Sequence, residues 1–100
     1  MTLDQVKREN MAAGLKFFEP GAMRFFSSRC SEDVFTGPGG VFFASSERDT
    51  YRDTNPRLYS VRRFDPETGT VATFGAFQGF ETLAQAKGAA RRAARSQPEE

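Results

Sequence analysis

Hydrophobic and polar positions alternate most clearly along residues 57–77, RLYSVRRFDPETGTVATFGAF. The middle of this stretch is a turn sequence, because Pro66 fixes φ and Gly69 can take the positive φ that closes a bulged loop. The pattern therefore predicts a β-hairpin in which Asp65 lies opposite Thr70. The register that follows pairs Phe64 with Val71, Arg63 with Ala72, Val61 with Phe74 and Tyr59 with Ala76.

The register also predicts which side chains share a face, since successive residues of a strand point to opposite sides. One face is mostly apolar, and we expect it to be the core face: Tyr59, Val61, Ala72, Phe74 and Ala76. On this assignment Phe74→Ala would cost about 3–5 kcal/mol of stability. Arg62 lies on the opposite, exposed face, where Arg62→Ala would change stability by no more than about 0.5 kcal/mol.

Helices are predicted at both ends of the chain. Thr2 and Gln5 form a capping box for a helix that ends near Gly14, a natural left-handed stop. Glu81 or Thr82 caps a second helix that runs to about residue 94. The inward stripe of this helix consists of small residues and one leucine, and it suits close packing on a sheet: Leu83, Ala86, Ala90 and Ala93 or Ala94.

Two further strands are predicted between the first helix and the hairpin, at residues 24–30 and 41–46. A short helical turn begins at Pro20, residues 31–40 form a loop that ends in GPGG, and residues 48–56 form a charged loop. The order of elements is α-β-β-β-β-α. We therefore expect an α+β fold with an antiparallel sheet of three to four strands and with both helices packed on one face. The domain covers residues 1–95, and residues 96–100 form a disordered tail.

Charge is balanced overall, with a net charge of +1, but it is unevenly distributed. Residues 57–95 contain seven basic and three acidic side chains, so the second half of the chain can present a basic face. Within the last helix Lys87, Arg91 and Arg95 recur every four residues and form an outward basic stripe. This stripe can contact phosphate groups, contact an acidic protein surface, or simply be solvated.

The composition excludes several kinds of chemistry. The chain has no histidine, one cysteine, and neither a GxGxxG nor a GxxxxGK[ST] motif, so we expect no catalytic site, no metal and no cofactor. Cys30 is expected to pack in a strand rather than react. No apolar run is long enough to span a membrane and the N-terminus lacks a signal sequence, which predicts a cytoplasmic protein without a membrane partner.

The eleven phenylalanines admit two interpretations. Aromatic side chains beside arginines on a sheet can stack on nucleic-acid bases. Alternatively, the phenylalanines fill the interior, and we favour this interpretation because a domain of this size needs large side chains in its core.

Two resemblances bear on function. The run Phe74-Gly75-Ala76-Phe77, followed by a helix with repeated alanines, is similar to the three-stranded DNA-binding domains of plant ethylene-response factors and integrase arm domains. That resemblance implies DNA contact through a sheet that presents Arg62 and Arg63. The motif residues of the helix are Ala84, Ala86, Ala89 and Ala90.

A second resemblance spans most of the chain. The segments at residues 12–18, 23–29, 37–43 and 59–69, which include AAG, FF, MRFF, GPGGV and the DPETG turn, resemble a small uncharacterised protein family carried by phages and plasmids. It implies a bacterial host, and small phage proteins of this kind often bind and block host defence complexes, including CRISPR effectors.

We therefore expect a non-enzymatic inhibitor that binds a host protein complex, with DNA binding as the alternative. Arginine and aromatic residues are the usual anchors of such interfaces. The expected partner-binding residues come from the charged loop, the hairpin and the last helix: Arg48, Tyr51, Arg52, Arg57, Arg62, Arg63, Lys87, Arg91 and Arg95.

Overall fold

The computed structural model of the protein describes residues 1–25, 28–48 and 57–96. These residues form a four-stranded antiparallel sheet in the order β1-β2-β3-β4. The strands are β1 (Arg29–Gly37), β2 (Gly40–Glu47), β3 (Leu58–Phe64) and β4 (Val71–Phe74). The helices are α1 (Leu3–Ala12), α2 (Pro20–Phe25) and α3 (Leu83–Arg95). The α+β class and the antiparallel sheet are confirmed.

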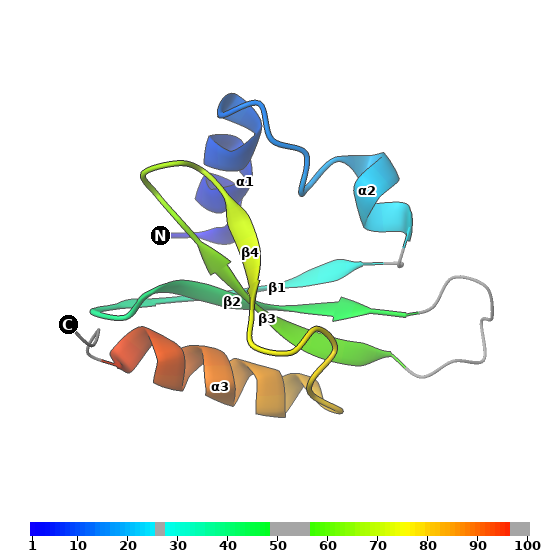
Figure 1. The fold of residues 1–100 in the computed structure, drawn as a ribbon, viewed down its shortest axis with the longest axis vertical. Coiled ribbons are helices and arrows are strands. Elements are labelled where there is room, and N and C mark those ends of the chain that lie inside the picture. Colours follow the sequence, from blue (N-terminus) through cyan, green and yellow to red (C-terminus); the bar gives the residue numbers. More distant parts are fainter. Residues whose placement is uncertain (26–27, 49–56, 97–100) are drawn as a thin grey trace.

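The helices lie on opposite faces of the sheet, with α1 and α2 above it and α3 below it in Figure 1. The prediction that both terminal helices pack on one face is wrong. The cause is visible in β2, whose adjacent residues Phe42 and Phe43 are both buried and point to opposite sides. Each face of the sheet therefore needs its own cover, and each helix supplies one.

Two small cores result. On the α1 side, Val6 of the helix packs with Phe43 and Phe64 of the sheet. On the α3 side, Phe42 and Val61 pack with alanines of the helix. Ala86, Ala90 and Ala94 are the buried residues of α3, which confirms the predicted stripe of small residues, whereas Leu83 is partly exposed. Both capping boxes, at Thr2 and at Thr82, are present.

The β3–β4 hairpin has the predicted turn and register. Val61 pairs with Phe74 and Phe64 with Val71, and the amide of Asp65 donates to the carbonyl of Thr70 at 2.9 Å. The predicted pair of Tyr59 and Ala76 is wrong. Strand β4 ends at Phe74, positive φ at Gly75 and Gln78 turns the chain, and Tyr59 pairs with Phe80 instead.

The first strand begins later than predicted. Residues 20–25 belong to helix α2, and β1 occupies most of the segment that was expected to be a loop. An irregularity in the pairing between Cys30 and Val34 interrupts the alternation of side chains. The sequence of β1 therefore lacks the alternating pattern of polar and apolar residues that predicts a strand. The GPGG segment is the turn between β1 and β2, and the amide of Gly39 donates to the carbonyl of Ala94 at 3.0 Å.

Gly69 holds the tip of the β3–β4 hairpin against α1. Its φ is +78°, and a Cβ at this position would lie 3.0 Å from the carbonyl oxygen of Glu9. Gly69→Val should therefore lower the free energy of unfolding by about 1–3 kcal/mol, measured by urea denaturation. Gly75 has a similar φ of +80° but open space around it, so Gly75→Val is the matched control. Equal losses in the two variants would show that contact with α1 adds nothing to the backbone strain.

Candidate functional site

Arg62 lies inside the protein, on the α1 side of the sheet. Its Nη2 is 2.6 Å from Oε1 of Glu47, whose side chain is fully buried. Ser45 and Ser60 donate hydrogen bonds to the two carboxylate oxygens, at 2.6 Å and 3.2 Å. Arg62 Nε also donates to Ser45 Oγ at 2.9 Å. The buried carboxylate is thus fully partnered, and the network joins β2 to β3.

The aromatic surroundings of Arg62 complete its enclosure. Its guanidinium lies 5.2 Å from the ring centroid of Phe17 and 5.4 Å from that of Phe77. Only 11% of the Arg62 side chain is exposed. The expectation that Arg62 is exposed is therefore wrong, because its charge is matched within the fold. Its role in binding a partner stays a prediction.

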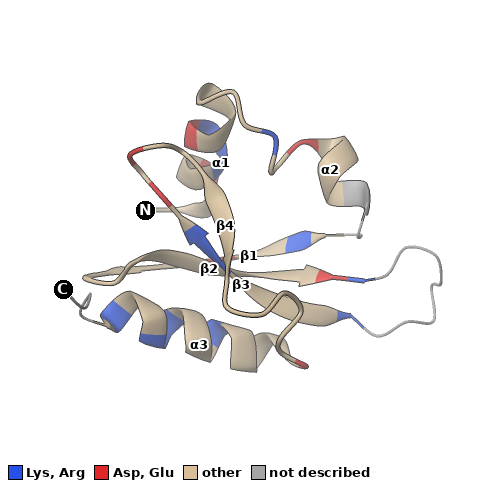
Figure 2. Cartoon of the chain, in the orientation of Figure 1, with Lys and Arg blue, Asp and Glu red and all other residues tan. Residues whose placement is uncertain are grey.

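Three exposed basic residues lie close together on α3. Arg91, Arg92 and Arg95 are exposed, and we call these three residues the α3 basic face. Helix α3 contains no acidic residue, and Figure 2 shows Lys and Arg along it without Asp or Glu. Among the residues that the structure describes, no residue of this face forms an ion pair within 4.0 Å.

Lys87 differs from the other basic residues of the helix. Its Nζ lies 2.6 Å from Oδ2 of Asp33 on β1. The hydrogen bond and the charge of Lys87 hold the pKa of the Asp33 carboxyl below its ordinary value. One turn later, Arg91 lies over the ring of Phe35 at 5.2 Å, which positions its guanidinium beside β1. The predicted basic stripe therefore has two parts. Lys87 forms an ion pair with Asp33, whereas the residues of the α3 basic face form none among the described residues.

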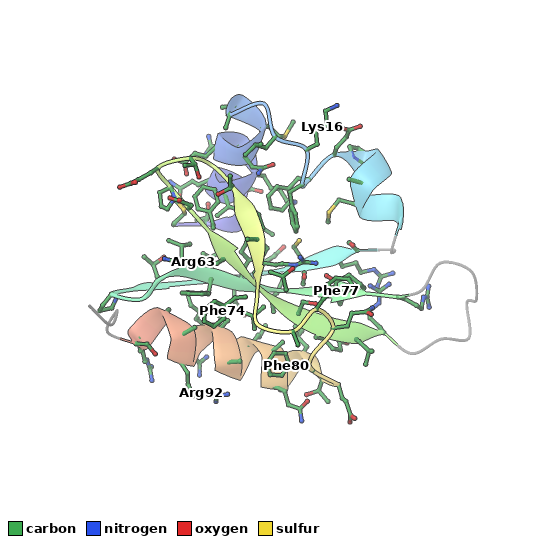
Figure 3. All side chains as sticks on the ribbon, in the orientation of Figure 1. Lys16, Arg63, Phe74, Phe77, Phe80 and Arg92 are labelled. Carbon is green, nitrogen blue, oxygen red and sulfur yellow. The ribbon has the colours of Figure 1, made fainter. Side chains whose placement is uncertain are left out.

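Arg63 lies on the same side of the sheet as α3. It is exposed, and its guanidinium lies 5.9 Å from the ring centroid of Phe42. Figure 3 shows Phe74 between the sheet and α3. Phe74 packs edge-on against Phe42 at 5.0 Å but keeps 47% of its surface exposed. Its predicted place at the centre of the core is therefore wrong, because β4 is an edge strand.

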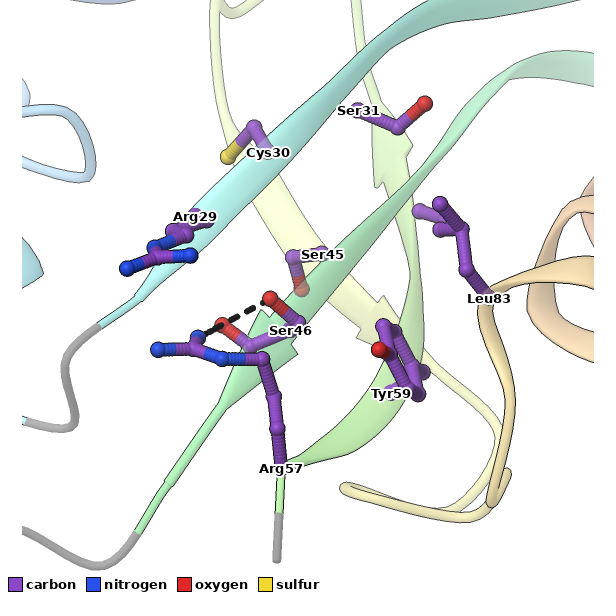
Figure 4. Close-up of a pocket in the computed structure, with 9 residues that line it drawn as sticks. Arg29, Cys30, Ser31, Ser45, Ser46, Arg57, Tyr59 and Leu83 are labelled. Carbon is purple, nitrogen blue, oxygen red and sulfur yellow. Dashed lines mark hydrogen bonds between the residues drawn. The ribbon is translucent and has the colours of Figure 1, made fainter. Parts of the chain in front are cut away.

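Two of the remaining predicted residues lie at the other end of the sheet. Arg48 follows β2, and Arg57, which Figure 4 shows, precedes β3. Burial lowers the pKa of the Arg57 guanidinium, and the charges of Arg29 and Arg48 lower it further, against smaller raising effects of Tyr59 and Glu47. Arg29 is absent from the predicted partner-binding residues, because β1 was placed too early in the chain. Tyr51 and Arg52 lie outside the described residues.

Cys30 is a poor candidate for a reactive residue. Burial raises the pKa of the Cys30 thiol to about 11, so the thiol is almost entirely protonated near neutral pH and is a weak nucleophile. Within residues 1–25, 28–48 and 57–96, no group of three or more Cys, Asp or Glu side chains is arranged to hold a metal ion. No helix in the same ranges is long and apolar enough to cross a membrane.

The sequence profile of DUF7447, a family of unknown function, matches residues 2–91, so the chain belongs to this family. The match covers α1, the whole sheet and α3 as far as Arg91. No curated protein and no solved structure matches the chain.

Proposed function

We propose that the protein acts by binding, and that the α3 basic face is the surface it presents to an acidic patch of a partner protein. One observation carries the proposal. Arg91, Arg92 and Arg95 gather on one turn of the helix, all exposed, and no carboxylate of the described residues pairs with them. By contrast, the carboxylates of Glu47 and Asp33 each pair with a basic side chain, Arg62 and Lys87.

The surroundings of the α3 basic face suit a protein interface. Phe35 lies under Arg91, which limits the conformations of that guanidinium and lowers the entropy lost on binding. Phe74 on the α3 side adds an exposed aromatic ring to the same side of the molecule. Arginine and aromatic side chains are enriched among the residues that dominate binding energy.

The partner is proposed from the resemblance to proteins of phages and plasmids. A host defence complex such as a CRISPR effector would be inhibited if this protein covered an essential surface of it. The alternative, a DNA-binding module, would use the same arginines on phosphates. Arg63, which is exposed on the α3 side of the sheet, would add to these contacts, whereas Arg62 is bonded to Glu47 inside the protein.

The test is affinity capture from a bacterial host lysate, with and without nuclease treatment. The informative variant is Arg92→Ala/Arg95→Ala. Among the described residues, neither side chain forms an ion pair or a cation–π contact with another element, and alanine preserves the helix. The matched control is Arg8→Ala/Lys16→Ala, which removes the same charge from exposed positions on the α1 side. Both variants should unfold within about 1 kcal/mol of the parent protein.

We expect one nuclease-resistant protein partner, captured at least about tenfold less by the α3 variant and equally well by the control. Capture that both variants retain would show that the α3 basic face is not the interface. Recovery of DNA alone would contradict the protein proposal and support the alternative. In that case the affinity for DNA should fall steeply with salt, by about one unit of log–log slope for each phosphate contacted.

A further inference from the structure

The outer edge of β4 is open, and it plays no part in the proposed function. Strand β4 is the last strand of the sheet and pairs with β3 on one side only. Helix α3 packs chiefly against the other three strands. Ala72, Thr73 and Phe74 are all exposed. An edge strand of this kind presents backbone donors and acceptors that a further strand can pair with.

The hydrogen bonds between β3 and β4 determine which backbone groups face outward. The amide of Asp65 donates to the carbonyl of Thr70, so these two residues form a hydrogen-bonded pair. Such pairs alternate along an antiparallel ladder, and Val71 and Thr73 therefore direct their amides and carbonyls away from β3. Among the residues that the structure describes, no turn or loop bonds to these outward groups.

The opposite edge of the sheet, β1, has features that discourage pairing. Its register is irregular between Cys30 and Val34, and the exposed acidic residues Glu32 and Asp33 lie within the irregularity. Bulges and charged side chains are devices that protect an edge strand. The sequence of β4, VATF, has no charge and no proline, and its register with β3 is regular. The sheet therefore has one protected edge and one edge whose residues favour pairing.

We infer that two copies of the chain associate through β4, antiparallel to each other, so that their two sheets join into one. Two identical antiparallel strands are related by a twofold axis, and each copy offers the same outward groups to the other. The register that uses all of them places Ala72 opposite Ala72 of the second copy. Val71 of each copy then exchanges backbone hydrogen bonds with Thr73 of the other.

The side chains of β4 are complementary in this register. On the α3 side, the small side chain of Ala72 lies at the axis and leaves room for the ring of Phe74 from the second copy, which lies diagonally across the interface. This contact would cover a ring that is 47% exposed in the single chain. On the α1 side, Val71 faces Thr73, and β-branched residues pack well across neighbouring strands.

The charges near β4 favour a second copy as the occupant of this edge. Strand β4 is uncharged, so the pairing brings no like charges opposite each other. The nearest basic residue on β3 is Arg63, which pairs with Ala72. The backbones of the two Arg63 residues would lie about 14 Å apart, the width of three strand spacings. This separation exceeds the Debye length of about 8 Å at physiological salt, so their repulsion is largely screened.

The experiment is sedimentation velocity of the full chain over a series of concentrations at neutral pH and physiological salt. The variants are Ala72→Glu and Ala72→Lys, each of which brings two like charges together at the axis. Within one copy, the new carboxylate of Ala72→Glu lies opposite Arg63, so this variant should fold. The matched control is Thr36→Glu, which adds the same charge at an exposed position of the β1 edge. Circular dichroism checks the fold of each variant.

We expect the parent chain and Thr36→Glu to form dimers with a Kd of about 100 µM or lower. Ala72→Glu and Ala72→Lys should each dimerise at least about tenfold more weakly. An equimolar mixture of these two should dimerise again, because a carboxylate then lies opposite an ammonium group.

A parent chain that stays monomeric at every concentration would overturn the inference and leave the edge to an extended segment of another protein. A dimer that Ala72→Glu leaves intact, or that Thr36→Glu weakens equally, would show that β4 is not the interface. Because the α3 basic face is intact in every sample, the result is separable from the capture experiment.

Discussion

Replacing Arg62 with alanine should lower the free energy of unfolding by roughly 3–5 kcal/mol. The change leaves the carboxylate of Glu47, fully buried on β2, without its cation and with only two serine hydroxyls as donors. The change also removes the contacts of the Arg62 guanidinium with the rings of Phe17 and Phe77. Urea denaturation followed by circular dichroism measures the loss.

Arg63→Ala is the matched control, because Arg63 is the next residue of the same strand and is exposed on the other face. It should cost no more than about 1 kcal/mol, the contribution of a single exposed contact with Phe42. The double variant Arg62→Met/Glu47→Leu removes both charges and should be more stable than Arg62→Ala. Similar small losses for Arg62→Ala and Arg63→Ala would show that the ion pair contributes little.

Phe43→Ala should also cost about 3–5 kcal/mol, measured in the same way. Phe43 is fully buried on β2 and packs among Val6, Val41 and Phe64, with the rings of Phe17 and Phe18 around it. Its removal opens a cavity in the core on which α1 docks, and that core is too small to close over it.

Phe74→Ala is the control for this change. Phe74 is 47% exposed on the edge strand, so its removal should cost only about 1–2 kcal/mol, mostly through its edge-on contact with Phe42. Together with the large loss expected for Arg62→Ala, this reverses the order of Phe74 and Arg62 that the alternation of the hairpin predicts. A larger loss at Phe74 than at Phe43 would contradict the arrangement of the two cores.

Local signals in the sequence were sufficient for the parts of the fold that depend on local physics. The DPETG turn determined the hairpin register, and the residues Thr2 and Thr82 determined where helices begin. Each of these features rests on interactions within a few residues, such as the positive φ of Gly69. Such interactions can be predicted from the sequence pattern without knowledge of the tertiary structure.

Tertiary pairing accounts for what the sequence pattern did not predict. Arg62 and Glu47 are partners across neighbouring strands, and nothing in their local sequence indicates that Phe17 and Phe77 cover this polar face. The adjacent residues Phe42 and Phe43 are the one indication in the sequence that both faces are covered, because two buried aromatic neighbours in a strand require a core on each side of the sheet.

The binding residues were predicted unevenly for the same reason. The four-residue spacing in α3 identified Arg91 and Arg95 as exposed, because helical periodicity is local. The pairing of Lys87 with Asp33 depends on where β1 lies, and β1 was misplaced because of the irregularity in its pairing. Arg29 is absent from the predicted partner-binding residues for that same reason.

The account depends most on the placement of the helices on opposite faces of the sheet, since this places Arg62 inside and leaves the α3 basic face outside. A nuclear Overhauser experiment on the full chain tests it directly. We predict contacts from the Phe43 ring to the methyl groups of Val6, and from the Phe42 ring to the methyl group of Ala90. Contacts from one of these rings to both Val6 and Ala90 would place the two helices on the same face and contradict the account.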